Sequence, residues 1–425
     1  MKFGGASIKD AHAVRNVGKI IGRFVPQTRL VVVISAMDKT TNHLERLAWM
    51  ARDSRETDTW EQFSKIKGFH FGIIDQLFGI ESSEAREQVE GYFSEIERIC
   101  RGILLLNEFP NHTYDRIVAY GELLSSCIVS NYLVQEGYKA AITDARRIIK
   151  TDASYTQARV VWSLTNDNLH KIVLPLLDQY DLVVTQGFIA SSTEGKVTTL
   201  GREGSDYTAS IFAQGLGAES LTVWKDVKGI LNGDPHIEPQ TVKLAALSYE
   251  RVVEMTFYGA SVIHPKTIKP IRNANIPMYV KCFKDMQLPG TVISSEGGKL
   301  QNDQVCIRVV KQGQALLRIQ PLDFSFMEAS LIHKIFENAA LARMEINLVQ
   351  TNAISLWVCA TYNDATISEF QSLLLDEFSF TTQLGLVLKM FINYGVEELN
   401  AVSNAVLVQR VENKLLAVME AQGSL

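Results

Sequence analysis

The stretch Arg29-Leu30-Val31-Val32-Val33-Ile34-Ser35-Ala36-Met37 decides the fold class. Its aliphatic residues, many of them β-branched, follow one another without polar alternation, which is typical of a strand covered on both faces. The stretches 181–188, 220–226 and 276–283 have the same character. Strands of this kind occur in parallel sheets, where crossover helices cover both faces.

Helical patterns separate these predicted strands along the chain. Strands that alternate with helices predict a mostly parallel sheet with helices on both faces, a three-layer α/β/α fold. Ligands in such folds bind at the carboxyl ends of the strands, where Ser35, Gly187 and Asp226 fall. The predicted helices cover residues 10–24, 42–53, 60–106, 113–136, 206–217, 248–257 and 266–274.

The totals exclude several classes of protein. A chain of 425 residues is long enough for two or three domains. Its net charge of −5 gives no overall basic field, so nucleic acid is not an expected partner. The five cysteines and eight histidines show no metal-binding spacing, which favours reduced thiols and no structural zinc. Because no apolar run reaches about 18 residues and no signal-peptide pattern is present, we expect a cytoplasmic protein that does not span a membrane.

A polar, turn-rich stretch at 284–303 predicts a boundary between two domains, 1–290 and 304–425. Beyond it the patterns predict a smaller α+β domain in the order strand, helix, strand, strand, helix. A shorter group of two strands and a helix follows. The predicted strands are Gln314–Gln320, Asn347–Gln350, Ile354–Ala360, Leu384–Ile392 and Ala405–Val408, and the predicted helices are Ser325–Ala342, Thr366–Phe378 and Glu412–Ala421.

Two glycine-containing segments carry the candidate site. The chain opens with Lys2 close to Gly4 and Gly5, where backbone amides can approach phosphate oxygens. Residues 201–209 read G-R-E-G-S-D-Y-T-A, which is a glycine-rich loop before a predicted helix, with an arginine and an aspartate four residues apart. An arginine fork suits a carboxylate, and the aspartate can face an ammonium group. The two segments predict a site that joins a nucleotide to a small zwitterion, without a P-loop motif.

Each of these residues also has a purely structural interpretation. Paired glycines are common in turns. Thr41 and Asp206 stand at predicted helix starts, where either could cap a helix. Glu122 lies in an apolar helical stretch, and composition alone places it on a solvated face. Lys39 and Thr40 fall in a predicted loop, where a solvated charge is the simpler interpretation.

Six motifs, in this order, resemble those of the aspartate kinases, which belong to the amino-acid kinase superfamily. They cover roughly residues 1–290, and the tail resembles the paired ACT regulatory domains of that family. The motifs are K-F-G-G-x-S at the start, V-I-S-A-M-x-K-T-T-N at 33–42, T-Q-G-F at 185–188, G-R-E-G-S-D-Y-T-A at 201–209, D-V-x-G-I at 226–230 and G-A-S-V-I-H-P-K at 259–266.

The resemblance implies that MgATP and L-aspartate give ADP and 4-phospho-L-aspartate, the first step toward lysine, threonine and methionine. The β-carboxylate of aspartate is already ionised at neutral pH, so this reaction needs no general base. Catalysis would come from positioning and charge stabilisation. By resemblance, Arg202 binds the α-carboxylate, Glu122 and Asp206 hold the ammonium, and Ser35, Thr41, Phe188 and Ser205 lie beside the substrate.

On the nucleotide side, the resemblance places Lys2, Gly4 and Gly5 at the transferring phosphoryl group. Mg²⁺ would be carried by the phosphates, with no protein metal ligand. The other nucleotide-binding residues that it implies are Ser7, Lys225, Asp226, Gly229, Ile230, Asp234 and Lys266. The chain departs from the usual family residues at Ala6 and Lys225 (threonine), Leu231 (tyrosine), His236 (arginine) and Ser261 (lysine).

Two alternative functions remain open at this point. The first is a related acyl-phosphate kinase that acts on glutamate or N-acetylglutamate. The second is a catalytically silent amino-acid sensor on the same scaffold, because several nucleotide-side residues differ from the family.

The tail also leaves alternatives open. The segment after Leu384 is short for a second ACT unit, which would then be truncated, and Thr351-Asn352-Ala353 stands where the family often reads T-S-E. The resemblance implies feedback binding of lysine or threonine near Ser325–Ala342 and Asn347–Gln350. A dimerisation module is the alternative, and a homodimer or higher homo-oligomer is expected.

Overall fold

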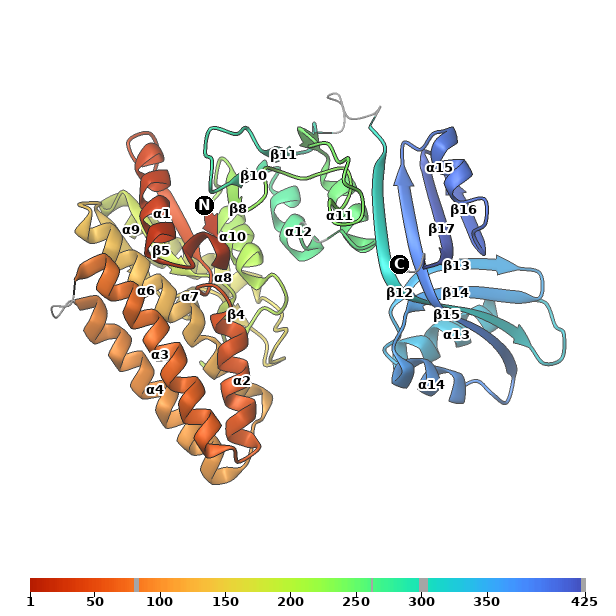
Figure 1. Cartoon of the computed structure of the whole chain (residues 1–425), viewed down its shortest axis with the longest axis horizontal. Helices are drawn as coiled ribbons and strands as arrows, with labels where there is room; N and C mark the ends of the chain where they lie inside the picture. The colour runs from red at the N-terminus through yellow and green to blue at the C-terminus, as the bar shows by residue number, and fades with distance from the viewer. Residues whose placement is uncertain (80–83, 261–262, 298–304, 422–425) are drawn as a thin grey trace. The chain divides into compact units, whose positions relative to one another are not determined.

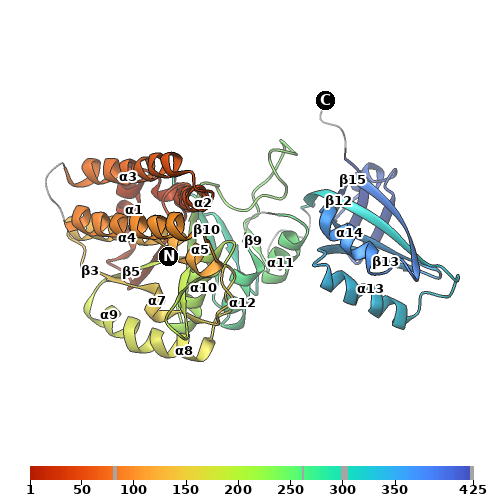
Figure 2. The same ribbon diagram turned by 90° about the horizontal axis from the view of Figure 1, so that it is seen from below.

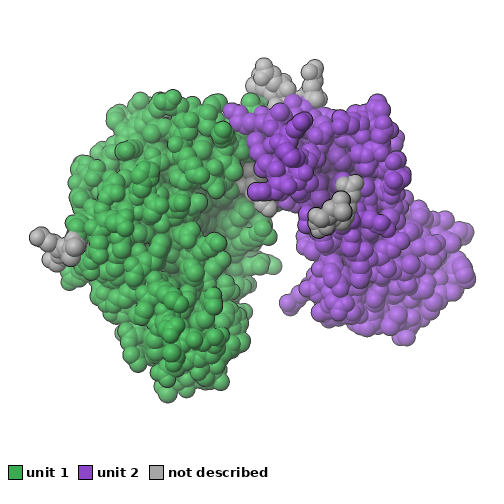
Figure 3. Space-filling view, in the orientation of Figure 1, with its two compact units in different colours: residues 1–230, 245–249, 263–297 green, residues 231–244, 250–262, 298–425 purple. Residues whose placement is uncertain are grey.

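The computed structural model describes residues 1–79, 84–260, 263–297 and 305–421 (Figure 1). These residues form two compact units (Figure 3). Unit 1 holds residues 1–230, 245–249 and 263–297, and unit 2 holds 231–244, 250–262 and the residues from 298 onward. The chain therefore enters unit 2 twice before the stretch 284–303, where we expect the domain boundary. That boundary stays a prediction, since 298–304 lie outside the described residues.

Unit 1 is built on an eight-stranded sheet. Its neighbouring strands are parallel, except for the antiparallel pair β10 and β11. This confirms the predicted α/β class. In spatial order the strands are β3 (Ala140–Thr143), β5 (Leu182–Gln186), β2 (Leu30–Ile34), β1 (Lys2–Phe3), β8 (Leu221–Lys225), β10 (Met278–Cys282), β11 (Thr291–Ile293) and β9 (Ala246–Leu247).

Helices cover both faces of this sheet (Figure 2). In β5, alternate residues point to opposite faces of the sheet: Leu182 and Val184 belong to one core cluster, and Val183 belongs to another. The first cluster packs against α1 (Ala11–Phe24), α2 (Thr40–Arg52), α3 (Glu56–Phe78), α4 (Glu84–Leu106), α5 (Asn111–Val118) and α6 (Tyr120–Gln135). The second includes residues of α7 (Ala145–Ile148), η2 (Leu169–Val173) and α10 (Gly204–Gly215).

Shorter elements make up the rest of the secondary structure described before residue 298. They include a three-stranded sheet whose strands were not predicted. The elements are η1 (Gly5–Ile8), β4 (Lys150–Thr151), α8 (Trp162–Asn168), α9 (Leu174–Gln179), β6 (Ile189–Ser192), β7 (Val197–Thr199), α11 (Tyr249–Phe257) and α12 (Pro265–Asn273).

Two long predicted helices are each divided. The stretch 60–106 contains α3 and α4, because α3 ends at Phe78 and the next residue, Gly79, has a φ of 85°, a positive value that glycine adopts without strain. The stretch 113–136 contains α5 and α6. By length and composition the segment Asn111–Gln135 could cross a membrane. Its 18-residue window has a mean hydropathy of 1.4, but 89% of that window is buried inside the structure. A helix that is apolar on all sides and buried in this way belongs to a core.

Unit 2 contains a six-stranded antiparallel sheet. The predicted order strand, helix, strand, strand, helix is confirmed by β12 (Ile307–Pro321), α13 (Ala329–Leu341), β13 (Ile346–Asn352), β14 (Ser355–Thr361) and α14 (Asp364–Ser372). The remaining elements are β15 (Phe378–Ile392), α15 (Val396–Ala401), β16 (Leu407–Val411) and β17 (Lys414–Glu420), and the spatial strand order is β13-β14-β12-β15-β17-β16.

The end of the chain corrects one prediction. The segment Glu412–Ala421 was expected to be a helix, but most of it is β17, which pairs with both β15 and β16. One short helix, α15, does fit between Ile392 and Ala405. Two small cores lie on this sheet, one under α13 and α14 and one around Phe391 and Val402. Whether the second group is a truncated ACT unit stays a prediction.

Candidate active site

A cavity of about 660 Å³ lies in unit 1, where β1, β2, β5 and β8 present their carboxyl ends or the residues just after them. This position agrees with the sheet-edge prediction. Many of the predicted site residues line it: Lys2, Ser35, Thr41, Glu122, Phe188, Arg202, Ser205, Asp206 and Lys225.

Two lysines meet one aspartate in this cavity. The ammonium of Lys2 lies 2.6 Å from Oδ1 of Asp206, and that of Lys225 lies 3.4 Å from Oδ2. Asp206 is only 2% exposed. Burial alone would raise the pKa of this carboxyl, but the charges and hydrogen bonds of Lys2 and Lys225 outweigh it and hold the pKa below its usual value. Asp206 is thus an ionised group at neutral pH.

Asp206 does not cap α10, which corrects the structural interpretation. The helix begins at Gly204 after Glu203, and its first position has no side-chain cap. Asp206 therefore lies inside the first turn, where its side chain turns to the lysines. Thr41 is likewise not a cap, because α2 begins at Thr40. The Thr40 hydroxyl donates to the carbonyl of Met37 at 2.6 Å and is buried, whereas Lys39 is exposed.

Glu122 of α6 is buried, with 2% exposure, so the solvated placement inferred from composition is wrong. The reason is that α6 is enclosed on all sides, and Gly121 brings its backbone against Ala36, where a Cβ would be 3.0 Å from that of Ala36. Oε1 accepts a hydrogen bond from the Ala36 amide at 3.2 Å. Oε2 has no partner among the described residues. Burial raises the pKa of Glu122 to about 8.

The loop after β5 packs closely against the start of α10. The hydroxyls of Ser35 and Ser205 are 3.0 Å apart. Gly187 makes this possible, since a Cβ there would lie 2.5 Å from the Cβ of Ser205. Phe188 adopts a φ of 66° and Glu203 one of 54°, and both residues line the cavity. Side chains in this left-handed region are strained, a feature that concentrates at functional sites.

Arg202 lies on the solvent-exposed side of the cavity. The neighbouring Glu203 does not pair with it. Instead, Oε2 of Glu203 accepts a hydrogen bond from the His264 amide at 2.7 Å. Within the described part of the chain, no carboxylate lies within ion-pair distance of the Arg202 guanidinium. Its fork is therefore available to a carboxylate that enters from solvent.

Asp115 of α5 is a residue that the sequence reasoning missed. It is fully buried, and its carboxylate accepts hydrogen bonds from the Thr156 amide and from both the amide and the hydroxyl of Thr199. Thr156 and Thr199 both line the cavity. Asp115 thus fixes two wall segments. The available signal was an acidic residue inside an apolar helical stretch, the same signal that singled out Glu122.

The glycine pair after β1 is explained by close packing. A Cβ at Gly5 would lie 2.8 Å from the carbonyl oxygens of Ala36 and Asp38, and one at Gly4 would lie 3.5 Å from the Lys2 ammonium. The Ser7 hydroxyl donates to the carbonyl of Trp224 at 3.4 Å and is buried. Gly4, Gly5 and Ser7 do not line the cavity. Their predicted contacts with the nucleotide stay predictions.

The other predicted nucleotide residues lie elsewhere. Asp226 is exposed just after β8, and Gly229 has a φ of 139°. The Ile230 amide donates to the Thr291 hydroxyl at 2.8 Å. Asp234 belongs to unit 2, where its carboxylate accepts from the His236 amide. Lys266 lines a separate cavity next to Lys269, and Ser261 lies outside the described residues.

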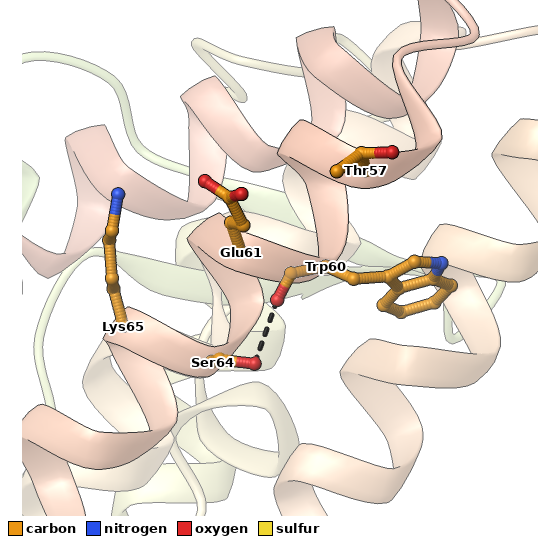
Figure 4. A pocket seen from close by; sticks show the side chains of 5 residues that line it. All are labelled: Thr57, Trp60, Glu61, Ser64 and Lys65. Carbon is orange, nitrogen blue, oxygen red and sulfur yellow. Dashed lines mark hydrogen bonds between the residues drawn. The ribbon is translucent and has the colours of Figure 1, made fainter.

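A further hollow lies on the exposed side of α3 (Figure 4). It is lined by Thr57, Trp60, Glu61, Ser64 and Lys65, and the Ser64 hydroxyl donates to the Trp60 carbonyl at 2.8 Å. These groups come from one helix and do not converge on a point (Figure 4). Within the residues that the structure describes, no group of three or more His, Cys, Asp or Glu side chains is arranged to hold a metal ion.

Fold and cavity together place a cluster of charged side chains at the carboxyl edge of a mostly parallel α/β sheet. The sequence profile described as the amino acid kinase family matches residues 1–282. The chain belongs to the amino acid kinase family.

Two known proteins, both aspartokinases, are similar to this chain in sequence over most of its length. Chloroplastic aspartokinase 3 of Arabidopsis thaliana is 32% identical over 84% of this chain, which spans 63% of that relative's length. Lysine-sensitive aspartokinase 3 of Escherichia coli is 29% identical over 84% of this chain and 76% of its own. The chain thus spans somewhat less than two thirds of the Arabidopsis relative that it matches.

Two crystal structures of E. coli aspartokinase III resemble this one, each at 26% sequence identity over 99% of this chain and 95% of that chain. The complex with aspartate and ADP, in the R-state, gives a TM-score of 0.83. The complex with lysine and aspartate, in the T-state, gives 0.77. These likenesses extend over both units.

Proposed function

We propose that the protein transfers the γ-phosphoryl group of MgATP to the β-carboxylate of L-aspartate, forming 4-phospho-L-aspartate. The observation that carries this proposal is the cavity's charge pattern. Lys2 and Lys225 supply cations at one place, Arg202 supplies a fork open to solvent, and Glu122 supplies a buried carboxyl oxygen that has no partner among the residues the structure describes. An aspartate zwitterion and a phosphate fit these three groups. The aspartate and ADP present in the related E. coli structure support the same pairing.

The substrate's α-groups are bound by oppositely charged side chains. Arg202 receives the α-carboxylate in a bidentate manner. The resemblance offers Glu122 and Asp206 for the α-ammonium group; both oxygens of Asp206 already contact lysines, so Glu122 is the carboxylate that receives it. Ser35 and Ser205 supply hydroxyls in the same cavity. Holding both α-groups leaves the β-carboxylate free to point at the phosphoryl group. Phe188, Thr41 and the strained loop around Phe188 and Glu203 shape the remaining walls.

The nucleotide contributes the phosphate and the metal. Lys2 and the amides near Gly4 and Gly5 bear the charge of the transferring group, and Lys225 lies on the same side of the cavity. Ser7, Asp226, Gly229, Ile230, Asp234 and Lys266 remain proposed nucleotide contacts. Mg²⁺ enters as MgATP, and because Mg²⁺ retains water ligands it needs few protein groups. No side chain has to remove a proton, since the attacking carboxylate is ionised.

Substrate-dependent release of ADP tests this proposal. We expect release with aspartate to exceed release with glutamate or N-acetylglutamate. Arg202→Ala should raise the KM for aspartate about 30-fold, because a charge-assisted hydrogen-bond pair contributes about 2 kcal/mol. Arg147→Ala is the matched control, since Arg147 is also exposed but does not line the cavity.

Two outcomes would overturn the proposal. Faster release with glutamate or N-acetylglutamate would assign the site to a related acyl-phosphate kinase. Nucleotide binding without ADP release from any of the three acids would favour the silent sensor. An Arg202→Ala variant that behaves like Arg147→Ala would remove the arginine from the substrate site while leaving the reaction itself standing.

We also propose features that concern the whole chain. We place an amino-acid effector, lysine or threonine, in unit 2, and the lysine-bound E. coli relative supports an effector of this chemical class. We expect a homodimer or higher homo-oligomer, and the antiparallel sheet supports this, because its outer strands β13 and β16 each have one open edge within the described residues. All five cysteines are free thiols, which suits a reducing, cytoplasmic location.

A further inference from the structure

Asp206 holds two ammonium groups at fixed positions on opposite oxygens. The contacts are 2.6 Å to Lys2 and 3.4 Å to Lys225, and the lysine side chains come from two adjacent parallel strands, β1 and β8. Lys2 pairs in register with Val223, two residues before Lys225. The sheet therefore brings both lysines to the same edge, and the carboxylate between them sets their spacing.

This trio differs from an ordinary ion pair. Its two positive charges share a single negative charge, so the trio as a whole is cationic. A stable structural pair would need only one lysine, and placing the partly buried Lys225 next to the buried Lys2 carries a cost in repulsion and desolvation. All three side chains line the cavity. An arrangement of this kind suits an anion that arrives in the cavity and gathers charge there during a reaction.

We propose that Lys225 is a second catalytic lysine, which binds the transferring phosphoryl group together with Lys2, and that Asp206 is the positioning residue that holds the two ammonium groups. This rests on the proposed function and deepens it. Because both oxygens of Asp206 are engaged, the substrate's α-ammonium group goes to Oε2 of Glu122, which has no partner among the described residues.

The chemical step needs no further group. A β-carboxylate oxygen of aspartate forms a bond to the γ-phosphorus, and the bond from that phosphorus to the β,γ-bridging oxygen breaks. Its electron pair leaves on ADP, so no proton is transferred. Charge on the three equatorial phosphoryl oxygens is spread in the transition state. Two lysines at set positions can each contact one of those oxygens.

Steady-state kinetics of the full chain provide the first test. Lys225→Met should lower kcat about 100-fold, the effect of removing one donor from a developing oxyanion, while the KM for aspartate changes by less than about threefold. Lys225→Arg, which keeps the charge, should retain more activity. Lys281→Met is the control, because Lys281 lies on the neighbouring strand β10 and does not line the cavity. A Lys225→Met enzyme with kcat within about threefold of the parent would overturn the catalytic role.

Nucleotide binding provides a second test that does not depend on turnover. Lys225→Met should weaken binding of Mg²⁺ with β,γ-imido-ATP by about tenfold or more, because it removes a charge at the γ-phosphoryl group, and should change ADP affinity by less than about twofold. Equal weakening for both nucleotides, or none, would contradict the inference. If the parent protein fails to phosphorylate aspartate but this difference holds, the proposed function fails, whereas the contact between Lys225 and the γ-phosphoryl group stands.

The role of Asp206 is tested by a double-mutant cycle. Asp206→Asn keeps the shape but releases both lysines, so the further loss caused by Lys225→Met should be much smaller in that background. Additive losses in kcat would mean that Asp206 does not position Lys225. Thermal unfolding of each variant accompanies the kinetics, and Lys225→Arg replaces Lys225→Met in the cycle if the methionine variant does not fold.

Discussion

The protonation state of Glu122 is expected to depend on whether substrate is bound. Without an ammonium partner, burial raises its pKa from 4.5 to about 8, so the carboxyl is largely protonated at neutral pH in the empty site. A bound α-ammonium group would favour the ionised form. Binding of aspartate is therefore expected to release a proton from Glu122 near neutral pH.

The same shift predicts a pH dependence of stability. A carboxyl whose pKa is raised in the folded state binds its proton more tightly there than in the unfolded chain. The stability that this contributes is present below pH 4.5 and is lost as the pH rises to about 8. Glu122→Gln should remove this loss, which amounts to a few kcal/mol at about 1.4 kcal/mol per pKa unit. Urea denaturation across that range measures it.

The two effects of Glu122→Gln should be opposite in sign. The variant should be more stable than the parent at pH 8 without substrate, yet bind aspartate more weakly. A variant that loses stability across the whole range from pH 4.5 to pH 8 would show that Glu122 is ionised and paired in the empty site. The sequence could not predict this environment, because the apolar residues around Glu122 do not reveal that α6 is enclosed on every side.

Element packing explains another buried group, His70 of α3. Its Nδ1 lies 2.8 Å from the carbonyl of Ile66, and Nε2 has no partner among the described residues. Burial lowers the pKa of His70 from 6.5 to about 4. A base with a lowered pKa in the folded state contributes stability above pH 6.5 that is lost as the pH falls toward 4.

We expect His70→Leu to reduce the acid sensitivity of unfolding. The replacement is apolar and similar in size, so it removes the proton-binding site without leaving a large cavity. His12→Leu is the control, because His12 is exposed on α1. Thermal unfolding between pH 6.5 and pH 4 measures the effect. An unchanged pH profile in His70→Leu would mean that another group controls acid unfolding.

A pair of glycine substitutions tests how β5 and α10 meet. Gly187→Ala would place a Cβ 2.5 Å from that of Ser205, so we expect a loss of about 1–3 kcal/mol in stability and of most activity. Gly102→Ala is the contrast, since Gly102 lies within α4 with no other atom within 4 Å of its would-be Cβ. That change should stabilise by about 0.5–1 kcal/mol. Similar denaturation midpoints for the two variants would contradict this packing.

Helices and strands were predicted best where the local sequence pattern alone determines them. The β-branched run that forms β2 is buried by both layers of helices, and its pattern is unambiguous. The segment that forms β17 contains good helix formers such as Leu415, Ala417 and Met419, and for that reason a helix was expected. Pairing with strands on both sides overrides local propensity there. Such pairing depends on distant residues that a local pattern cannot identify.

At the scale of the whole molecule, the chain passes between the two units more than once. Residues 231–244 belong to unit 2, although residues 245–249 that follow them belong to unit 1. Within unit 2, residues 231–244 are bound to β12 and the residue before it. The Asn232 side-chain amide donates to the Cys306 carbonyl at 2.9 Å, and the main-chain carbonyl of Asn232 accepts from the Arg308 amide at 2.7 Å. Arg308 also contacts Glu238 at 3.2 Å and Glu398 at 2.7 Å. The sequence patterns gave no sign of this attachment, since it joins residues that lie far apart.

Arg308→Met should loosen this attachment. Burial would raise the pKa of Glu398, but hydrogen bonds from Arg308 and from the Gly395 amide lower it to about 2. The stability that this provides is present above pH 4.5 and is lost as the pH falls to about 2. Removing Arg308 leaves a buried carboxylate unpaired and should cost about 3 kcal/mol.

Hydrogen exchange of residues 231–244 and 396–401 measures the loosening. Arg410→Met is the control, because Arg410 is exposed on β16. Adding Glu398→Gln to Arg308→Met should restore part of the protection, since the unpaired charge is then gone. Faster exchange in Arg410→Met than in Arg308→Met would contradict the attachment described here.

The measurement that most directly tests the central claim is trapping of the acyl phosphate with hydroxylamine. The parent protein is incubated with MgATP and L-aspartate, and the hydroxamate and ADP are quantified together. We predict aspartate β-hydroxamate in amounts equal to ADP, with both products absent when aspartate is omitted. ADP without hydroxamate, or nucleotide binding with neither product, would contradict the claim that this cavity joins ATP to the β-carboxylate of aspartate.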